Sequence, residues 1–164
     1  MSAEFRRWAS EMRTIENTLS LWVSGILTSA EVIAWAERQI IRLDAPPMEL
    51  IDLMMSGPQA CLKWAQSDFP PRARSLEYDE AFSVRALLLS LESDAAVLDF
   101  AVWAADACMG EVLTNPMVKL GYVLDHHIND CRDYDGAMAL VRTELPKLLN
   151  TCKIIAEPFE DVAQ

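Results

Sequence analysis

The stretch Asp94-Ala-Ala-Val-Leu-Asp-Phe-Ala-Val-Trp-Ala-Ala-Asp-Ala-Cys-Met109 says most about the architecture, because nearly all of its side chains are apolar or small. A surface helix buries one stripe, whereas a helix that is apolar nearly all round needs neighbours on most sides. Asp99 and Asp106 are seven residues apart, so they share one narrow line along such a helix. We therefore predict a central helix that other helices surround.

Helical periodicity continues on both sides of this stretch. Apolar residues recur at spacings of three and four, and no segment alternates as a strand would. Over residues 78–92 this pattern predicts that Leu87 and Leu88 face inward. The sequence thus predicts an all-α fold, with a single domain of six to eight helices over residues 1–157 packed around 94–109, and a frayed tail over 158–164.

Capping and breaking residues mark the helix boundaries. Thr28 and Glu31 have the spacing of a capping box, and Ser93 is suited to cap the central helix. Gly57, followed by proline, is expected to end a short apolar helix that begins after Pro46-Pro47. Pro146 falls inside the last helix and is expected to kink it.

The four cysteines are scattered, with no Cys-x-x-Cys pair among them. Cys108, Cys131 and Cys152 each fall on a predicted apolar helix face, where a free cysteine behaves as a small hydrophobe. We therefore expect reduced thiols in a core rather than a disulfide framework, which suits smaller secreted chains.

The composition argues against a membrane or exported protein. The chain has 164 residues, of which 52% are hydrophobic, yet no apolar run reaches the roughly 18 residues that a membrane span needs. The N-terminus has charges but no apolar signal core behind them. A cytoplasmic location is the expectation.

Negative charge is concentrated in one part of the chain, whose net charge is −11. Residues 1–43 contain five arginines and five glutamates, whereas residues 77–135 contain twelve acidic and three basic residues. A surface of this kind repels nucleic acid and attracts basic partners. The sequence therefore favours a basic protein as the partner and argues against nucleic acid.

Residues 27–57 contain a Trp-Ala helix around Trp35, the Pro46-Pro47 corner, and a Leu-Ile helix around Leu50. In these features they resemble small uncharacterised bacterial proteins, some of which look like immunity proteins of contact-dependent or polymorphic toxin systems. The resemblance implies a helical fold and the neutralisation of a toxin. It concerns helix packing and so assigns no catalytic or binding residue.

The segment Asp125–Asp135 contains the best candidates for chemistry. On an α-helix, His126, Asp130 and Asp133 would share one face, where they could bind a divalent metal if another helix supplied a ligand. A solvated acidic face is the plainer interpretation, because the chain has no second histidine cluster and no Glu-x-x-His motif. No cofactor is expected, since hydrolase elbows, Walker loops and dinucleotide-binding glycines are absent.

Two further patterns have a packing and a functional interpretation. A carboxylate in apolar surroundings, such as Asp99 or Asp106, could act as a general acid or base, but two aspartates on an apolar helix more often mark its wet edge. The five tryptophans could line a hydrophobic ligand pocket, but four of them adjoin alanine, a size pairing typical of close helix packing.

These observations favour a cytoplasmic protein-binding module, most concretely an immunity protein against a bacterial toxin, over an enzyme. A nuclease toxin is one such partner, because it needs a basic surface to hold nucleic acid. The alternatives are a metal-binding or hydrolytic protein using residues 125–135 and a helical adaptor subunit. The acidic residues expected to contact the partner are Glu77, Asp79, Glu80, Asp125, Asp130 and Asp133.

Overall fold

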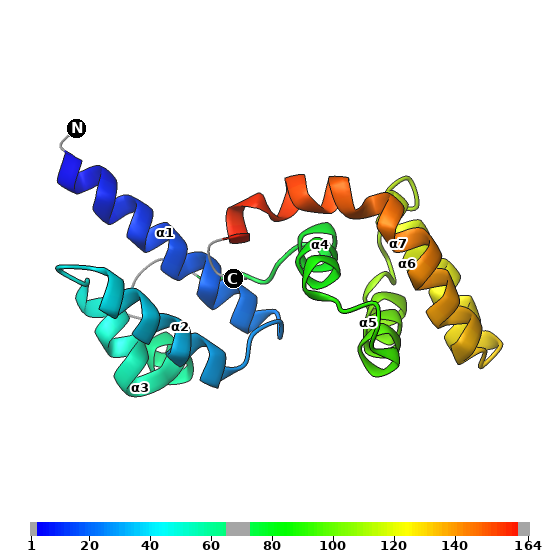
Figure 1. Cartoon of the computed structure of the whole chain (residues 1–164), viewed down its shortest axis with the longest axis horizontal. Coiled ribbons are helices and arrows are strands. Elements are labelled where there is room, and N and C mark those ends of the chain that lie inside the picture. The colour runs from blue at the N-terminus through cyan, green and yellow to red at the C-terminus, as the bar shows by residue number, and fades with distance from the viewer. Residues whose placement is uncertain (1–2, 65–72, 161–164) are drawn as a thin grey trace. The chain divides into compact units, whose positions relative to one another are not determined.

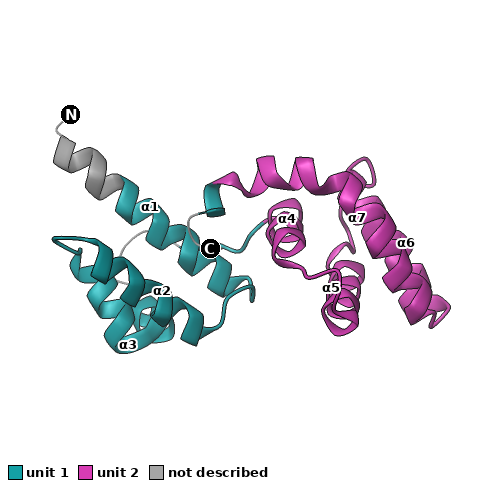
Figure 2. Ribbon diagram, viewed as in Figure 1, with its two compact units in different colours: residues 1–76, 158–164 teal, residues 77–157 magenta. Residues whose placement is uncertain are grey.

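The computed structural model describes residues 3–64 and 73–160, and within them the protein is entirely helical, with seven α-helices and no strand (Figure 1). This confirms the prediction of an all-α fold of six to eight helices. The chain divides into two compact units, unit 1 (residues 1–76 with 158–164) and unit 2 (residues 77–157), which Figure 2 distinguishes by colour. The assignment of one domain to residues 1–157 stays a prediction.

Unit 1 contains α1 (Ala3–Val23), α2 (Ser29–Arg42) and α3 (Met48–Trp64). The predicted capping box starts α2: the Thr28 hydroxyl accepts the Glu31 N–H at 3.2 Å, and the Glu31 carboxylate accepts the Thr28 N–H at 2.7 Å. Both interactions satisfy backbone donors that the first helical turn leaves open. Because the Glu31 carboxylate accepts hydrogen bonds from Thr28, its pKa is lowered.

Gly57 interrupts α3 where the sequence predicts a stop. Its φ of 75° and ψ of 166° are not helical, and helical geometry resumes at once with Pro58. Only glycine adopts such a conformation readily, and proline suits the first position of the helix that follows. Helix α3 therefore consists of two helical segments joined by a kink at Gly57.

The chain returns to unit 1 at its C-terminal end. The side-chain amide of Asn17 donates to the carbonyl of Pro158 at 2.6 Å, and Phe159 is almost fully buried. Residues 158–160 therefore differ from the frayed tail predicted there, since an apolar ring anchors them. Residues 161–164 lie outside the described part.

Unit 2 contains the apolar helix that the sequence predicts to be central. Its elements are α4 (Tyr78–Leu88), α5 (Asp94–Ala107), α6 (Pro116–Asp125), a π-helical turn (His126–Asp130) and α7 (Tyr134–Ala156). Helix α5 contacts α4, α6 and α7. Its buried residues are Val97, Phe100, Ala101, Ala104 and Ala105.

The boundaries of these helices agree with the sequence-based prediction in some places and differ from it in others. Ser93 and Asn115 cap α5 and α6 as expected, each side chain accepting a backbone N–H two or three residues on. Helix α4 already ends at Leu88, and Leu87 and Leu88 are exposed, so the prediction that they face inward is wrong. Helix α7 bends along its length in Figure 1 and contains Pro146, which lacks the N–H of a regular helix.

Candidate functional site

The first group of predicted partner-binding residues forms the start of α4. The Glu80 carboxylate accepts the Glu77 N–H at 3.0 Å, and the Asp79 carboxylate accepts the Glu80 N–H at 2.9 Å. Negative charge is favourable at a helix N-terminus, where backbone N–H groups point outward. Glu77, Asp79 and Glu80 therefore have a structural role in addition to any role in binding.

The second group lies at the end of α6 and in the turn that leads to α7 (residues 125–133), where each carboxylate has an intramolecular partner. Asn129 donates to Asp125 at 2.6 Å. His126 Nδ1 lies 2.9 Å from Asp130 Oδ2, and His127 Nδ1 lies 2.9 Å from Asp133 Oδ2. These contacts fix the positions of three carboxylates within one short turn, and the side chains of Asp130 and Asp133 remain 68% and 47% exposed.

Asp133 also caps α7. Its Oδ1 accepts the Gly136 N–H at 2.9 Å. This bond, together with that from His127, holds the pKa of the Asp133 carboxyl below its ordinary value. Removing an N-cap side chain leaves a backbone N–H at the start of the helix without its side-chain acceptor and so destabilises the helix. Asp133 is consequently a poor position at which to test binding by charge reversal, whereas Asp130 has no such role.

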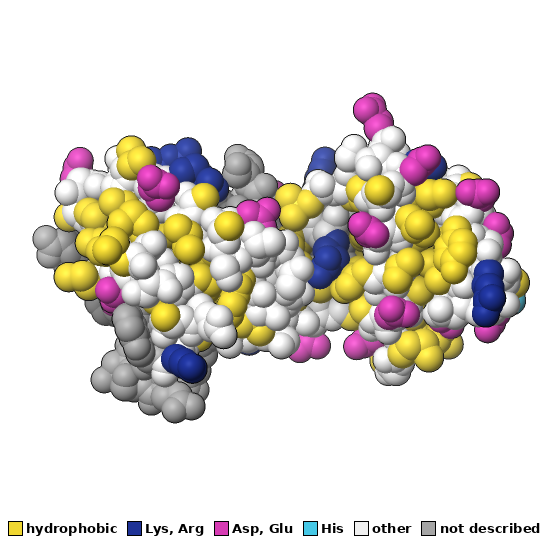
Figure 3. Space-filling model, turned by 90° about the horizontal axis from the view of Figure 1, so that it is seen from below, with side chains coloured by type: hydrophobic (Ala, Val, Ile, Leu, Met, Phe, Trp, Pro, Cys, Tyr) yellow, Lys and Arg dark blue, Asp and Glu magenta, His cyan; other side chains and the backbone are white. Residues whose placement is uncertain are grey.

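The structure does not gather all six acidic residues at one place. The start of α4 and the turn between α6 and α7 are well separated within unit 2 (Figure 1). Acidic side chains are spread over the face of unit 2 visible in Figure 3, around patches of hydrophobic side chains. The turn between α6 and α7 is thus the more compact candidate, with the start of α4 as a second negative area.

The metal hypothesis needed His126, Asp130 and Asp133 on one helical face. The structure pairs His126 with Asp130 and gives Asp133 to His127 instead. Across residues 3–64 and 73–160, no group of three or more His, Cys, Asp and Glu side chains is placed to hold a metal ion. The turn therefore offers two separate imidazole–carboxylate pairs.

Cys131 lies elsewhere than predicted. The apolar stripe of an α-helix would bury it, but α6 ends at Asp125 and a π-helical turn follows, so Cys131 is exposed. In this turn the Cys131 N–H donates to the His126 carbonyl at 3.0 Å, an i→i+5 bond. The Cys131 Sγ then lies 3.5 Å from His126 Nε2. The α-helical period used to interpret the sequence could not reveal this contact.

The other three cysteines follow the prediction. Cys61, Cys108 and Cys152 are free and fully buried. Burial raises the pKa of the Cys61 thiol to about 11 and also raises the pKa of the Cys108 and Cys152 thiols. They are consequently inert core thiols at neutral pH.

The aspartates of α5 lie at its solvent-exposed edge, and two of the tryptophans pack between helices. Asp99 and Asp106 are exposed on α5, as expected of its wet edge. Trp103 stacks on a tyrosine ring in the unit 2 core. Trp35 is buried at the junction of three helices, beside a cavity of about 70 Å³ that also receives side chains from α1 and α3. The side chains of Trp8 and Trp64 lie outside the described part.

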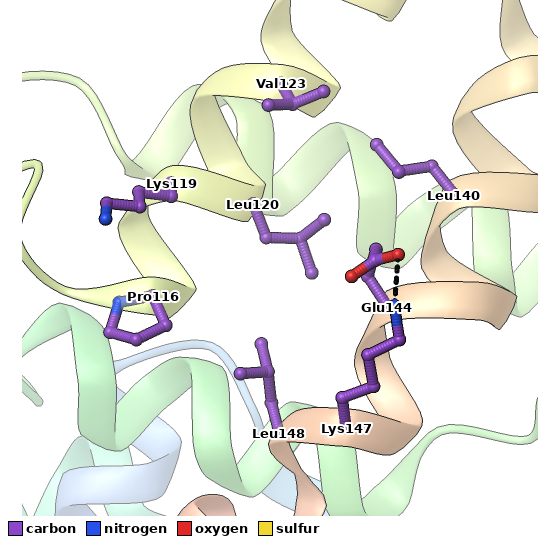
Figure 4. A pocket seen from close by; sticks show the side chains of 8 residues that line it. All are labelled: Pro116, Lys119, Leu120, Val123, Leu140, Glu144, Lys147 and Leu148. Atoms are coloured by element: carbon purple, nitrogen blue, oxygen red, sulfur yellow. Dashed lines mark hydrogen bonds and ion pairs between the residues drawn. The ribbon is translucent and has the colours of Figure 1, made fainter.

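A larger cavity lies between α6 and α7 and was not foreseen from the sequence. It has a volume of about 380 Å³. Apolar side chains from both helices line it, together with the charged side chains of Lys119, Glu144 and Lys147 (Figure 4). Lys147 pairs with Glu144 at 2.7 Å, so part of its charge is compensated. The residues that line the cavity are separated along the chain and follow no motif, so no sequence pattern indicates the cavity. The cavity is large enough for an apolar side chain or a small ligand.

No described helix has both the length and the apolar character needed to cross a bilayer. No protein-family model matches the chain, and neither a curated protein nor a solved structure is significantly similar to it.

Proposed function

We propose that the protein is a binding module that engages a basic protein partner through the turn between α6 and α7. The observation that supports this most is the fixed arrangement of Asp125, Asp130 and Asp133 there. A carboxylate already held in place loses less conformational freedom when it binds a lysine or arginine, so such a turn is pre-organised for a basic surface.

The charge of unit 2 adds to this argument. Residues 77–157 contain fourteen acidic and six basic residues. Of the basic ones, Arg142 pairs with Asp94 and Lys147 with Glu144. Each pair neutralises one cation and one carboxylate, so fourteen negative charges against six positive ones still leave these residues a net charge of −8. Clustered charge of one sign steers an oppositely charged partner and raises the rate of association.

In its most concrete form, the proposal is that the protein is a cytoplasmic immunity protein and that its partner is a bacterial toxin with a basic nucleic-acid-binding surface. An acidic module that covers such a surface blocks access of the nucleic acid. A helical adaptor would use the same surface without a toxic partner. A hydrolytic protein would need a nucleophile, a base and an oxyanion site arranged around a substrate.

Co-expression distinguishes these forms. The natural candidate for the partner is the product of the adjacent reading frame, expressed alone and together with this protein. We expect growth arrest when the partner is expressed alone, relief on co-expression, and a stable complex in gel filtration. A complex without growth arrest would identify an adaptor, and a toxic neighbour that this protein neither binds nor neutralises would refute the immunity role.

A further inference from the structure

We propose that Cys131, with His126 as its base and Asp130 as a positioning residue, is a reactive surface thiol that undergoes thiol–disulfide exchange with small disulfides bearing amino groups. The proposal is independent of the partner-binding function, since it concerns the sulfur atom of one residue. It rests on the arrangement of three side chains within the turn between α6 and α7.

The three side chains stand in the order nucleophile, base and orienting carboxylate. Cys131 Sγ lies 3.5 Å from His126 Nε2, and His126 Nδ1 lies 2.9 Å from Asp130 Oδ2. The carboxylate thus engages one ring nitrogen and directs the other towards the sulfur. This is the geometric pattern by which activated nucleophiles are recognised, independently of fold or chain position.

The π-helical turn creates the arrangement. In an α-helix, residues five apart point about 140° away from each other, because one turn takes 3.6 residues. The i→i+5 bond from Cys131 to His126 widens the turn and brings the two side chains to the same side. Arg132 follows with a φ of 54°, in the left-handed region that non-glycine residues seldom adopt, and there the chain turns towards α7.

The site is open to a small reagent. Cys131 is exposed, and the side chains of His126 and Asp130 are 63% and 68% exposed. All four cysteines lie in the described part of the chain, and the other three are buried. Reaction with a water-soluble disulfide is therefore confined to Cys131 in the folded protein.

The exchange step is balanced without any further reagent. His126 Nε2 takes the thiol proton, and the Cys131 thiolate attacks one sulfur of the disulfide. The new sulfur–sulfur bond forms as the old one breaks, and the departing thiolate takes the proton back from the imidazolium. The products are a mixed disulfide on Cys131 and one equivalent of free thiol.

The surrounding charge selects the kind of disulfide. Residues 125–135 contain four aspartates and one arginine. A reagent with amino groups is concentrated in such a negative potential, and one with carboxylates is repelled. At low ionic strength we expect cystamine to react several-fold faster than dithiodipropionate, and we expect added salt to reduce the difference.

The test uses the full chain and an uncharged disulfide, dithiodipyridine, whose released thiopyridone absorbs light. One thiol should react quickly in the native protein and the other three only after unfolding, and Cys131→Ser should remove the fast reaction. His126→Ala and His126→Gln should slow it by at least about tenfold, somewhat less than a positioned base contributes in a closed site. Added imidazole should restore much of the rate in His126→Ala.

Asp130 and His127 supply the remaining comparisons. Asp130→Asn should slow the reaction less than the His126 variants do, and Asp130→Glu should recover part of the loss. His127→Ala is the matched control, because His127 pairs with Asp133. This substitution should leave the reaction rate of Cys131 unchanged. The proposal is overturned if the folded His126 variants react as fast as the wild type, or if Cys131 reacts no faster than N-acetylcysteine amide.

Discussion

Replacement of Phe82 with alanine is expected to lower the free energy of unfolding by about 3–5 kcal/mol, the range for a large-to-small change at a buried aromatic. Phe82 is fully buried in the unit 2 core. Its ring lies 5.2 Å from that of Phe100 in an edge-on arrangement and 5.9 Å from that of Tyr78. The substitution therefore removes two aromatic contacts as well as buried apolar area.

Urea unfolding followed by circular dichroism measures this effect. Leu88→Ala is the matched control, because Leu88 is on the same helix but 48% exposed, and its loss should stay below about 1 kcal/mol. A loss for Phe82→Ala no larger than that of the control would contradict the placement of Phe82 in the core.

The second large effect is expected at Gly121, in the middle of α6. A Cβ at this position would lie 2.6 Å from Cys108 Cβ and 2.9 Å from the Ala104 carbonyl oxygen, both on or next to α5. A residue with a side chain forces these helices apart, which typically costs about 1–3 kcal/mol. Alanine favours a helix over glycine by only about 1 kcal/mol, so Gly121→Ala should be destabilising overall and Gly121→Val more so.

Thermal unfolding of the two variants tests this expectation. Lys119→Ala on the same helix is the control, since Lys119 is exposed and its replacement should leave the melting temperature nearly unchanged. If Gly121→Ala melts at or above the wild-type temperature, the close approach of α5 and α6 is wrong.

Local signals in the sequence predict most of the fold. Thr28, Ser93 and Asn115 start helices because a cap depends on residues two or three positions away. The apolar stretch 94–109 is correctly predicted to be a helix, and α5 packs against α4, α6 and α7, although its face around Val102 remains exposed. The prediction for Leu87 and Leu88 is wrong, because the apolar periodicity over residues 78–92 does not reveal that α4 ends at Leu88.

The site was predictable only in part. The sequence identifies the acidic character of residues 125–135, but a helical wheel assumes 3.6 residues per turn and so groups His126 with Asp133. The π-helical turn changes these neighbours: Asp133 caps α7, and Cys131 moves from the predicted core to the surface beside His126. Within the turn Ile128 is buried, whereas Asn129 and Asp130 are exposed.

The measurement that tests the proposed binding surface most directly is the rate of association with the partner at increasing salt. Asp130→Lys is compared with Glu37→Lys, an equal change in net charge on the exposed face of α2 in unit 1. At ~0.15 M salt, screening limits the range of interactions between exposed charges to about 8 Å, so only a charge near the interface strongly affects the association rate. We expect Asp130→Lys to slow association roughly threefold or more, Glu37→Lys to have little effect, and the wild-type rate to fall as salt rises. Equal rates for the two variants, or a rate independent of salt, would contradict the assignment of this turn as the binding surface.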